Sequence, residues 1–198
     1  MEKKIVLASG NFGKLKELRD KLGHVADFVP QSDFGIETPE ETGSSFVENA
    51  LLKASYVAEL TGLPSLADDS GLSVDALDGA PGIYSARYAG PEASDDDNNA
   101  KLLQDLKDVP TEARTAAFHC ILALVYPENV EQSILCDGVW RGRILTESKG
   151  SNGFGYDPIF QPEGLDISSA ELSAEHKNQI SHRGKAMAML IGRLTEPL

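Results

Sequence analysis

Residues 65–71 read SLADDSG, and this stretch indicates how the chain folds. The short apolar run Ser65–Ala67 predicts a strand. We expect this strand to end at Asp68 and Asp69 and to be followed by a turn at residues 70–71. Successive strand side chains point to opposite faces, so two adjacent acids cannot serve one surface. A positively charged partner is therefore expected near this strand end.

Strands and helices alternate on both sides of this stretch. Ser45 and Glu48 form an S-x-x-E capping box, which predicts a helix from there to Gly62. The other predicted elements are, in chain order, a strand at Lys4–Ala8, a helix at Lys14–Leu22, strands at Ala26–Val29 and Leu72–Ala76, a helix capped by Ser94, a hairpin of Thr115–Val125 with Val130–Val139, a strand at Pro158–Phe160 and a helix from Ser181. This order predicts the α/β class, with a mixed central sheet flanked by helices and a single domain over residues 1–198.

Length and charge restrict the function. The 198 residues carry a net charge of −13, which argues against a nucleic-acid polymer as partner but allows a small anion in a lysine-lined pocket. No stretch approaches the roughly 18 apolar residues that a membrane span needs, and no signal peptide precedes the first strand, so we expect a cytoplasmic protein. The two cysteines, Cys120 and Cys136, are interpreted as reduced, buried thiols.

The loop Ser9–Lys14, with the sequence SGNFGK, lies between a buried strand and a helix. Its two glycines allow close approach of a ligand, and helix N-terminal amides with a lysine favour an anion. It is not a Walker loop, because Leu15 stands where that motif needs Ser or Thr. A plain strand–helix turn with a surface lysine is the alternative.

Acidic residues come from two separate segments. Asp68 and Asp69 follow a strand, where open α/β sheets place ligands, and Glu40 and Glu41 precede the capped helix. Carboxylates that meet beside an anion pocket predict a magnesium site, and turn or cap chemistry is the alternative. Composition alone suggests that Lys53 is a solvated helix lysine. The acids of 95–97 are explained by the helix dipole rather than by a metal.

The loop SNGFGYDP, residues 151–158, places two aromatic rings among glycines. Such a loop can present a ring face to a base, with backbone groups free to read the base edge; a hydrophobic plug is the alternative. His182 and Arg183 fall in the first turn of the last helix, where cations oppose the helix dipole, and this suggests contact with a ligand.

Six stretches carry a resemblance to a known family: SGNFGK, EETG, LADDSGL, GAPGIYSARY, GFGYDP and AEHKNQISHRGKA, in this order. From about Lys4 to about Leu194 the chain resembles the inosine triphosphate pyrophosphatase family. The resemblance implies two lobes around a nucleotide cleft. It also implies hydrolysis of ITP, dITP and XTP to the monophosphate and pyrophosphate, a requirement for Mg²⁺, and a homodimer that cleanses the nucleotide pool. A Maf-type nucleotide pyrophosphatase and a non-catalytic nucleotide sensor are the alternatives.

The same resemblance implies a role for individual residues. Asp69 corresponds to the general base or metal-site acid, with Glu41 as second metal ligand and Glu40 as the alternative to it. Asp68 and Lys53 are further candidate catalytic residues. The implied triphosphate contacts are Ser9, Gly10, Asn11, Phe12, Gly13 and Lys14, and Ser70 is an adjacent substrate contact. The implied base pocket comprises Phe154, Gly155, Tyr156, Asp157, Lys177, His182 and Arg183. Ser9 departs from the commoner threonine but keeps the hydroxyl.

Overall fold

The computed structural model describes residues 4–195, so three residues at each end of the domain predicted over 1–198 lie outside it. The strands are β1 (Lys4–Ala8), β2 (Asp27–Pro30), β3 (Ser65–Val74), β4 (Thr115–Val125), β5 (Ile134–Ile144) and β6 (Phe160–Pro162). The α-helices are α1 (Phe12–Leu22), α2 (Phe46–Thr61), α3 (Asp95–Asp105), α4 (Ala174–Ile180) and α5 (His182–Thr195). None of these described helices is both long enough and apolar enough to span a membrane.

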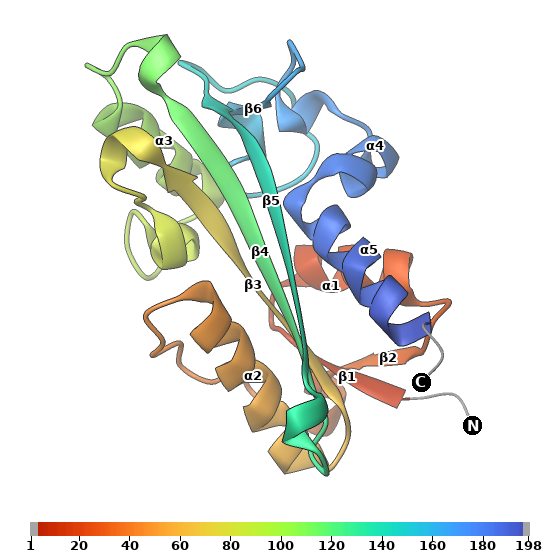
Figure 1. Cartoon of the computed structure of the whole chain (residues 1–198). Coiled ribbons are helices and arrows are strands. Elements are labelled where there is room, and N and C mark those ends of the chain that lie inside the picture. The colour runs from red at the N-terminus through yellow and green to blue at the C-terminus, as the bar shows by residue number, and fades with distance from the viewer. Residues whose placement is uncertain (1–3, 196–198) are drawn as a thin grey trace. The chain divides into compact units, whose positions relative to one another are not determined.

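The six strands form one sheet in the order β2-β1-β3-β4-β5-β6 (Figure 1). β1 pairs in parallel with β2 and with β3, whereas β5 and β6 are antiparallel. The predicted α/β class with a mixed sheet flanked by helices is confirmed.

The chain divides into two compact units. Unit 1 comprises the described residues up to Asp69, then Cys120–Gly138, then those from Arg183 onward. Unit 2 comprises Ser70–His119 and Val139–His182. β3, β4 and β5 each contribute residues to both units, and every contact described below lies within one unit.

The core of unit 1 follows from the alternation of side chains along β1. Ile5 and Leu7 pack in a cluster with apolar residues of α1 and α5, among them Leu18 and Met187. Val6 and Ala8 pack in a second cluster with alanines of α2. Figure 1 shows the corresponding arrangement, with α2 on one side of β1 and α1 and α5 on the other. A strand covered on both faces explains why residues 4–8 read as a continuous apolar run.

The core of unit 2 is more aromatic. Phe118, Trp140 and Phe160 come from three strands and pack with Leu102 of α3. The rings of Phe118 and Phe160 meet edge to face, with centroids 4.7 Å apart, which is a favoured aromatic geometry.

Some predicted boundaries are wrong. The expected turn at residues 70–71 does not form, because β3 runs without a break from Ser65 to Val74. Gly71 and Leu72 are buried there, and the amide of Leu72 donates to Ser85 Oγ at 2.9 Å. Tertiary packing thus overrides the local turn signal of Ser-Gly.

Differences in the later elements are smaller. β5 begins at Ile134 after a 3-10 turn at Val130–Gln132, and the last strand starts at Phe160. Helix α4 was not predicted as a separate helix before α5. The caps predicted at Ser45 and Ser94 are confirmed, since each side chain accepts a hydrogen bond from the third residue after it. The capping box predicted for Ser45 is only half formed, because the Glu48 carboxylate accepts from the amide and hydroxyl of Ser44 instead of the Ser45 amide.

Candidate active site

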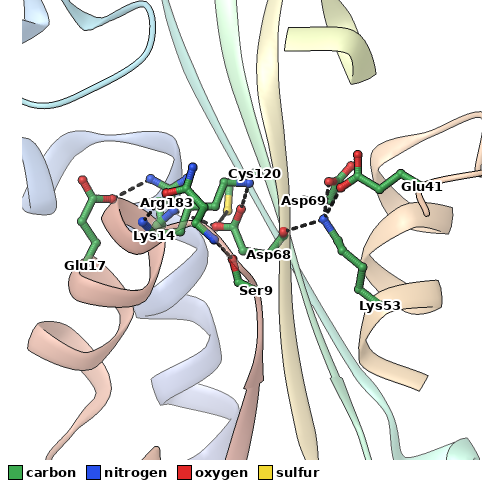
Figure 2. A network of polar contacts seen from close by, with 10 residues as sticks. Ser9, Lys14, Glu17, Glu41, Lys53, Asp68, Asp69, Cys120 and Arg183 are labelled. Carbon is green, nitrogen blue, oxygen red and sulfur yellow. Dashed lines mark hydrogen bonds and ion pairs between the residues drawn. The ribbon is translucent and has the colours of Figure 1, made fainter. Parts of the chain in front are cut away.

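Asp68 and Asp69 lie side by side in β3 and point to opposite faces of the strand (Figure 2). Asp68 faces α1 and α5, and Asp69 faces α2. The predicted separation of the two acids is therefore confirmed, although the strand continues past them. Each meets a lysine ammonium, Lys14 for Asp68 and Lys53 for Asp69, so each carboxylate has the positive partner that the sequence led us to expect.

Asp68 is the centre of a buried polar network. Its Oδ1 lies 2.7 Å from the Lys14 Nζ, and its Oδ2 accepts hydrogen bonds from Arg183 Nε at 2.7 Å and from the Cys120 thiol at 3.4 Å. Arg183 is 2% exposed and also contacts Glu17 at 2.5 Å. Burial alone would raise the pKa of Asp68, but the charges of Arg183 and Lys14 outweigh it and hold the pKa well below its ordinary value. Asp68 is therefore a permanent anion that orients Lys14.

The predicted anion loop leads from β1 into α1. Asn11 caps the helix, since its Oδ1 accepts a hydrogen bond from the Lys14 amide at 3.0 Å. Ser9 is buried, and its Oγ accepts a hydrogen bond from the Asn11 amide at 3.2 Å. Phe12, by contrast, is 82% exposed. A capped helix start with a lysine in its first turn is suited to binding an anion.

Asp69 belongs to a second cluster, on the face toward α2. The Lys53 Nζ lies 2.6 Å from Asp69 Oδ1, 2.8 Å from Glu41 Oε1 and 3.0 Å from the carbonyl oxygen of Asp68. Lys53 is 5% exposed, so its interpretation as a solvated helix lysine is wrong. Of the two predicted glutamates, Glu41 joins this cluster, whereas Glu40 is exposed.

A buried asparagine holds the loop that carries Glu41. Asn49 lies one helical turn before Lys53 in α2, and its Oδ1 accepts a hydrogen bond from the Gly43 amide at 2.8 Å. A side chain at Gly43 would overlap Asn49 and Glu48, so the approach of this loop to α2 requires glycine. The sequence signal for Asn49 was its spacing of four residues from Lys53, which puts both on one helix face.

The ionisation of this cluster suits proton transfer. Burial raises the pKa of Asp69 to about 6, although the charge of Lys53 opposes the rise. Burial would lower the pKa of Lys53, but Asp69 and Glu41 raise it, so the ammonium stays charged. A carboxylate with a pKa near 6 is ionised at neutral pH and is still basic enough to accept a proton from water.

The donor set of Glu41 and Asp69 fits a magnesium ion. The two carboxylates converge on a single cation, the Lys53 ammonium, which shows that this place attracts positive charge. Within residues 4–195 no group of three or more Asp, Glu, His or Cys side chains could hold a metal by itself. Mg²⁺ commonly takes one or two carboxylates and completes its shell with water and substrate phosphates, so two carboxylates are sufficient.

The loop 153–157, called the base loop below, lies in unit 2 and is fixed by its own polar groups. Asp157 Oδ2 accepts hydrogen bonds from the Phe154 amide at 2.9 Å and from Lys177 Nζ at 2.6 Å, and Oδ1 accepts one from Ser169 Oγ at 2.8 Å. The Lys177 Nζ also lies 4.8 Å from the centre of the Phe154 ring. The expectation that the backbone of this loop is free is wrong for the amides of Phe154 and Gly155, which are both bonded within unit 2.

The other residues predicted to contact the base or the adjacent part of the substrate do not all lie in the same unit. Tyr156 is buried in the core of unit 2 and donates its hydroxyl to the Ser85 carbonyl at 2.8 Å, which favours the plug interpretation for this ring. The His182 ring stacks on the Phe118 ring, also in unit 2, with the ring centroids 4.8 Å apart. Ser70 belongs to unit 2 as well and is half-buried. Arg183 belongs to the Asp68 network of unit 1.

The sequence did not single out four residues that the structure brings to these clusters: Glu17, Asn49, Asn99 and Ser169. It assigned Asp95 only to the helix dipole, whereas the structure bonds Asp95 to Gly155. It noted Cys120 only as a thiol. Glu17 had a detectable signal, because it follows Lys14 by three residues and so lies on the same face of α1. Cys120 and Ser169 had none, because their partners are distant in sequence.

Residues 5–193 match the Ham1 family. The chain is 53% identical over 195 residues to a dITP/XTP pyrophosphatase of Vibrio cholerae, covering 98% of each chain. It is 57% identical over 190 residues to one of Pseudomonas aeruginosa, covering 96% of each chain. A HAM1 protein structure from Coxiella burnetii is similar with a TM-score of 0.91 and 48% identity, over 98% of this chain and 100% of that one.

Proposed function

The chain belongs to the Ham1 family, and from this premise we propose that it hydrolyses the noncanonical purine nucleotides ITP, dITP and XTP to the nucleoside monophosphate and pyrophosphate. The names of its relatives, dITP/XTP pyrophosphatases at 50–57% identity, support this activity. The single observation that carries the proposal is the Lys53 ammonium shared by Glu41 and Asp69, on the face of β3 opposite to the Lys14–Asp68 pair.

The two lysines supply the positive charge that a triphosphate needs. In the proposed reaction Lys14, at the start of α1, contacts the phosphates, and Asp68 keeps its ammonium in place. Lys53 neutralises charge that develops on the leaving pyrophosphate, as phosphoryl transfer requires. Both ammonium groups already have carboxylate partners, so they are oriented before substrate arrives.

Asp69 acts on the attacking water. Water attacks the α-phosphorus, the bond from this phosphorus to the bridging oxygen breaks, and pyrophosphate leaves. Asp69 orients the water and accepts its proton, which its pKa of about 6 permits. Glu41 and Asp69 would hold a magnesium ion, which when bound supplies charge neutralisation on the phosphate oxygens.

The base is assigned to unit 2. We propose that the Phe154 ring, backed by Lys177, stacks on the purine, and that His182 and neighbouring polar groups contact its edge. Hypoxanthine and xanthine carry an oxygen at C6, whereas adenine carries an amino group there. A donor facing C6 accepts the first two bases, and a donor left unpaired costs about 1–3 kcal/mol. Arg183 remains a candidate contact, although its Nε and Nη1 are already bonded to Asp68 and Glu17.

The test is release of pyrophosphate from a panel of nucleotides with Mg²⁺. We expect ITP, dITP and XTP to be cleaved far faster than ATP or GTP. A preference for other bases would favour a Maf-type pyrophosphatase, and binding of ITP without release of pyrophosphate would favour a sensor.

Three further expectations complete the proposal. The family resemblance supports a homodimer, which light scattering during size-exclusion chromatography tests. It also supports one functional domain over residues 1–198 and a place in the cytoplasm, where the nucleotide pool is. A monomeric mass at micromolar concentration would contradict the first of these.

A further inference from the structure

Helix α3 makes two hydrogen bonds to the backbone of one residue of the base loop, Gly155. The amide of Gly155 donates to Asp95 Oδ2 at 2.6 Å, and the carbonyl of the same residue accepts from Asn99 Nδ2 at 3.0 Å. Asp95 and Asn99 are four residues apart in α3 and therefore project from one face of the helix. Asn99 is 5% exposed, so the second bond is shielded from water.

This contact gives Asp95 a role in addition to complementing the helix dipole. Of the three acids in the first turn of α3, Asp97 closes a capping box with Ser94, and Asp95 reaches across to Gly155. Gly155 itself has a φ of +60°, a left-handed conformation that favours glycine. The base loop is thus held in an uncommon backbone conformation by side chains of another element.

The same helix also fixes a second loop. Asn98 Oδ1 accepts a hydrogen bond from the Ala89 amide at 2.8 Å, and Asn98 Nδ2 donates to the Ala86 carbonyl at 3.3 Å. Ala86 belongs to the 3-10 helix Gly82–Arg87, and the adjacent Ser85 carbonyl accepts the Tyr156 hydroxyl. Neighbouring asparagines of α3 therefore tie two loops of unit 2 to one rigid element.

The bonds have a chemical consequence for base recognition. With the Phe154 amide on Asp157 and the Gly155 amide on Asp95, neither amide is available to a ligand. The loop then offers the Phe154 ring without two additional donors beside it. If Asp95 were lost, the Gly155 amide could donate to any acceptor on a base edge, including the ring nitrogens of adenine and guanine. Discrimination would fall as the loop loosened.

We infer that Asp95 and Asn99 are positioning residues that fix the base loop and thereby set the preference among purine bases. The inference rests on the proposed function, in which this loop binds the purine. Neither residue touches the reacting atoms; both act through Gly155 on the placement of Phe154.

The variants Asp95→Ala and Asn99→Ala test the inference, with Asp96→Ala as a matched control. Asp96 lies in the same helical turn and carries the same charge, so its removal has the same effect on the helix dipole. Each test variant is expected to raise KM for ITP about fivefold, because losing one hydrogen bond changes an equilibrium constant by about that factor. Each should also lower the ratio of kcat/KM for ITP to that for GTP, and the ratio of kcat/KM for ITP to that for ATP. Asp95→Asn keeps an acceptor oxygen and should restore most of the discrimination.

Two further measurements separate positioning from general damage. Inhibition by inorganic triphosphate, which has no base, should keep the wild-type inhibition constant in every variant. Hydrogen exchange at residues 153–157 should become faster in Asp95→Ala but not in Asp96→Ala. The inference is overturned if Asp95→Ala and Asp96→Ala discriminate equally, if triphosphate binding weakens along with ITP binding, or if loop exchange is unchanged. Wild-type protein that releases no pyrophosphate from ITP would instead overturn the proposed function, while loop exchange still reports whether α3 holds the loop.

Discussion

Replacing Lys53 by methionine should make the nucleotide-free protein bind a divalent cation more tightly while turnover is lost. The Lys53 ammonium contacts Asp69 Oδ1 at 2.6 Å and Glu41 Oε1 at 2.8 Å, the two carboxylates assigned to the metal. Lysine and metal ion therefore draw on the same negative charge. Methionine keeps the apolar stem of the side chain and removes only the charge.

The distances set the size of the effect. With metal–oxygen bonds of about 2.1 Å, a cation on these oxygens lies within about 5 Å of the ammonium. Charges of +1 and +2 at that separation repel by about 1.7 kcal/mol in water and about 6.6 kcal/mol at an effective dielectric of about 20. Even the smaller value corresponds to more than about a tenfold change in affinity.

The assay is titration of nucleotide-free protein with Mn²⁺, followed by electron paramagnetic resonance at pH 8, which is above the pKa of about 6 that burial gives Asp69. Lys16→Met is the control, because Lys16 is exposed on α1 and its loss changes the net charge equally. Equal or weaker Mn²⁺ affinity in Lys53→Met than in Lys16→Met would refute the reasoning. It would mean that the lysine and the metal do not compete for Glu41 and Asp69.

Four other outcomes are expected. Asp69→Asn should lower pyrophosphate release roughly a hundredfold or more while the protein stays folded; near-normal turnover of the folded variant would remove the assigned role of Asp69. Lys14→Ala should raise KM for ITP and lower kcat, and unchanged constants would leave SGNFGK a simple turn. Burial raises the pKa of Asp69 to about 6, and protonation there removes the base, so kcat/KM should fall as pH drops through about 6; a flat profile to pH 5 would contradict this. Arg183→Ala removes one cationic partner from the buried Asp68 and one from the half-buried Glu17, and should cost about 3–5 kcal/mol of unfolding free energy in urea titrations; a loss below about 1 kcal/mol would speak against this network.

The sequence was sufficient wherever the relevant information is local. The two-residue period of a strand predicted that Asp68 and Asp69 face apart, and the capping box at Ser45 located the start of α2. The Ser-Gly pair after Asp69 led to the wrong prediction of a turn. The local turn signal is overridden because packing keeps both residues in a long strand.

Pairings between distant residues were beyond local patterns. Arg183 and Asp68 are 115 residues apart, and no spacing rule connects them. The same limit applies to Lys53, whose helical position looked solvated until Asp69 and Glu41 were seen to enclose its ammonium. For the base loop, composition suggested free backbone groups, whereas Asp95 and Asp157 occupy two of its amides through side chains that no local rule places there.

The buried thiol beside Asp68 provides a natural probe of how unit 1 opens. Burial and the Asp68 charge raise the pKa of Cys120 well above its ordinary value, and Cys136 is also buried with a raised pKa. The thiolate is the nucleophile that attacks an alkylating reagent, so both cysteines should react only when the core around them is transiently exposed. The alkylation rate of the native protein therefore reports the frequency of that opening without any introduced label. The alkylation rates of variants that weaken the Asp68 network can be compared directly with that of the native protein.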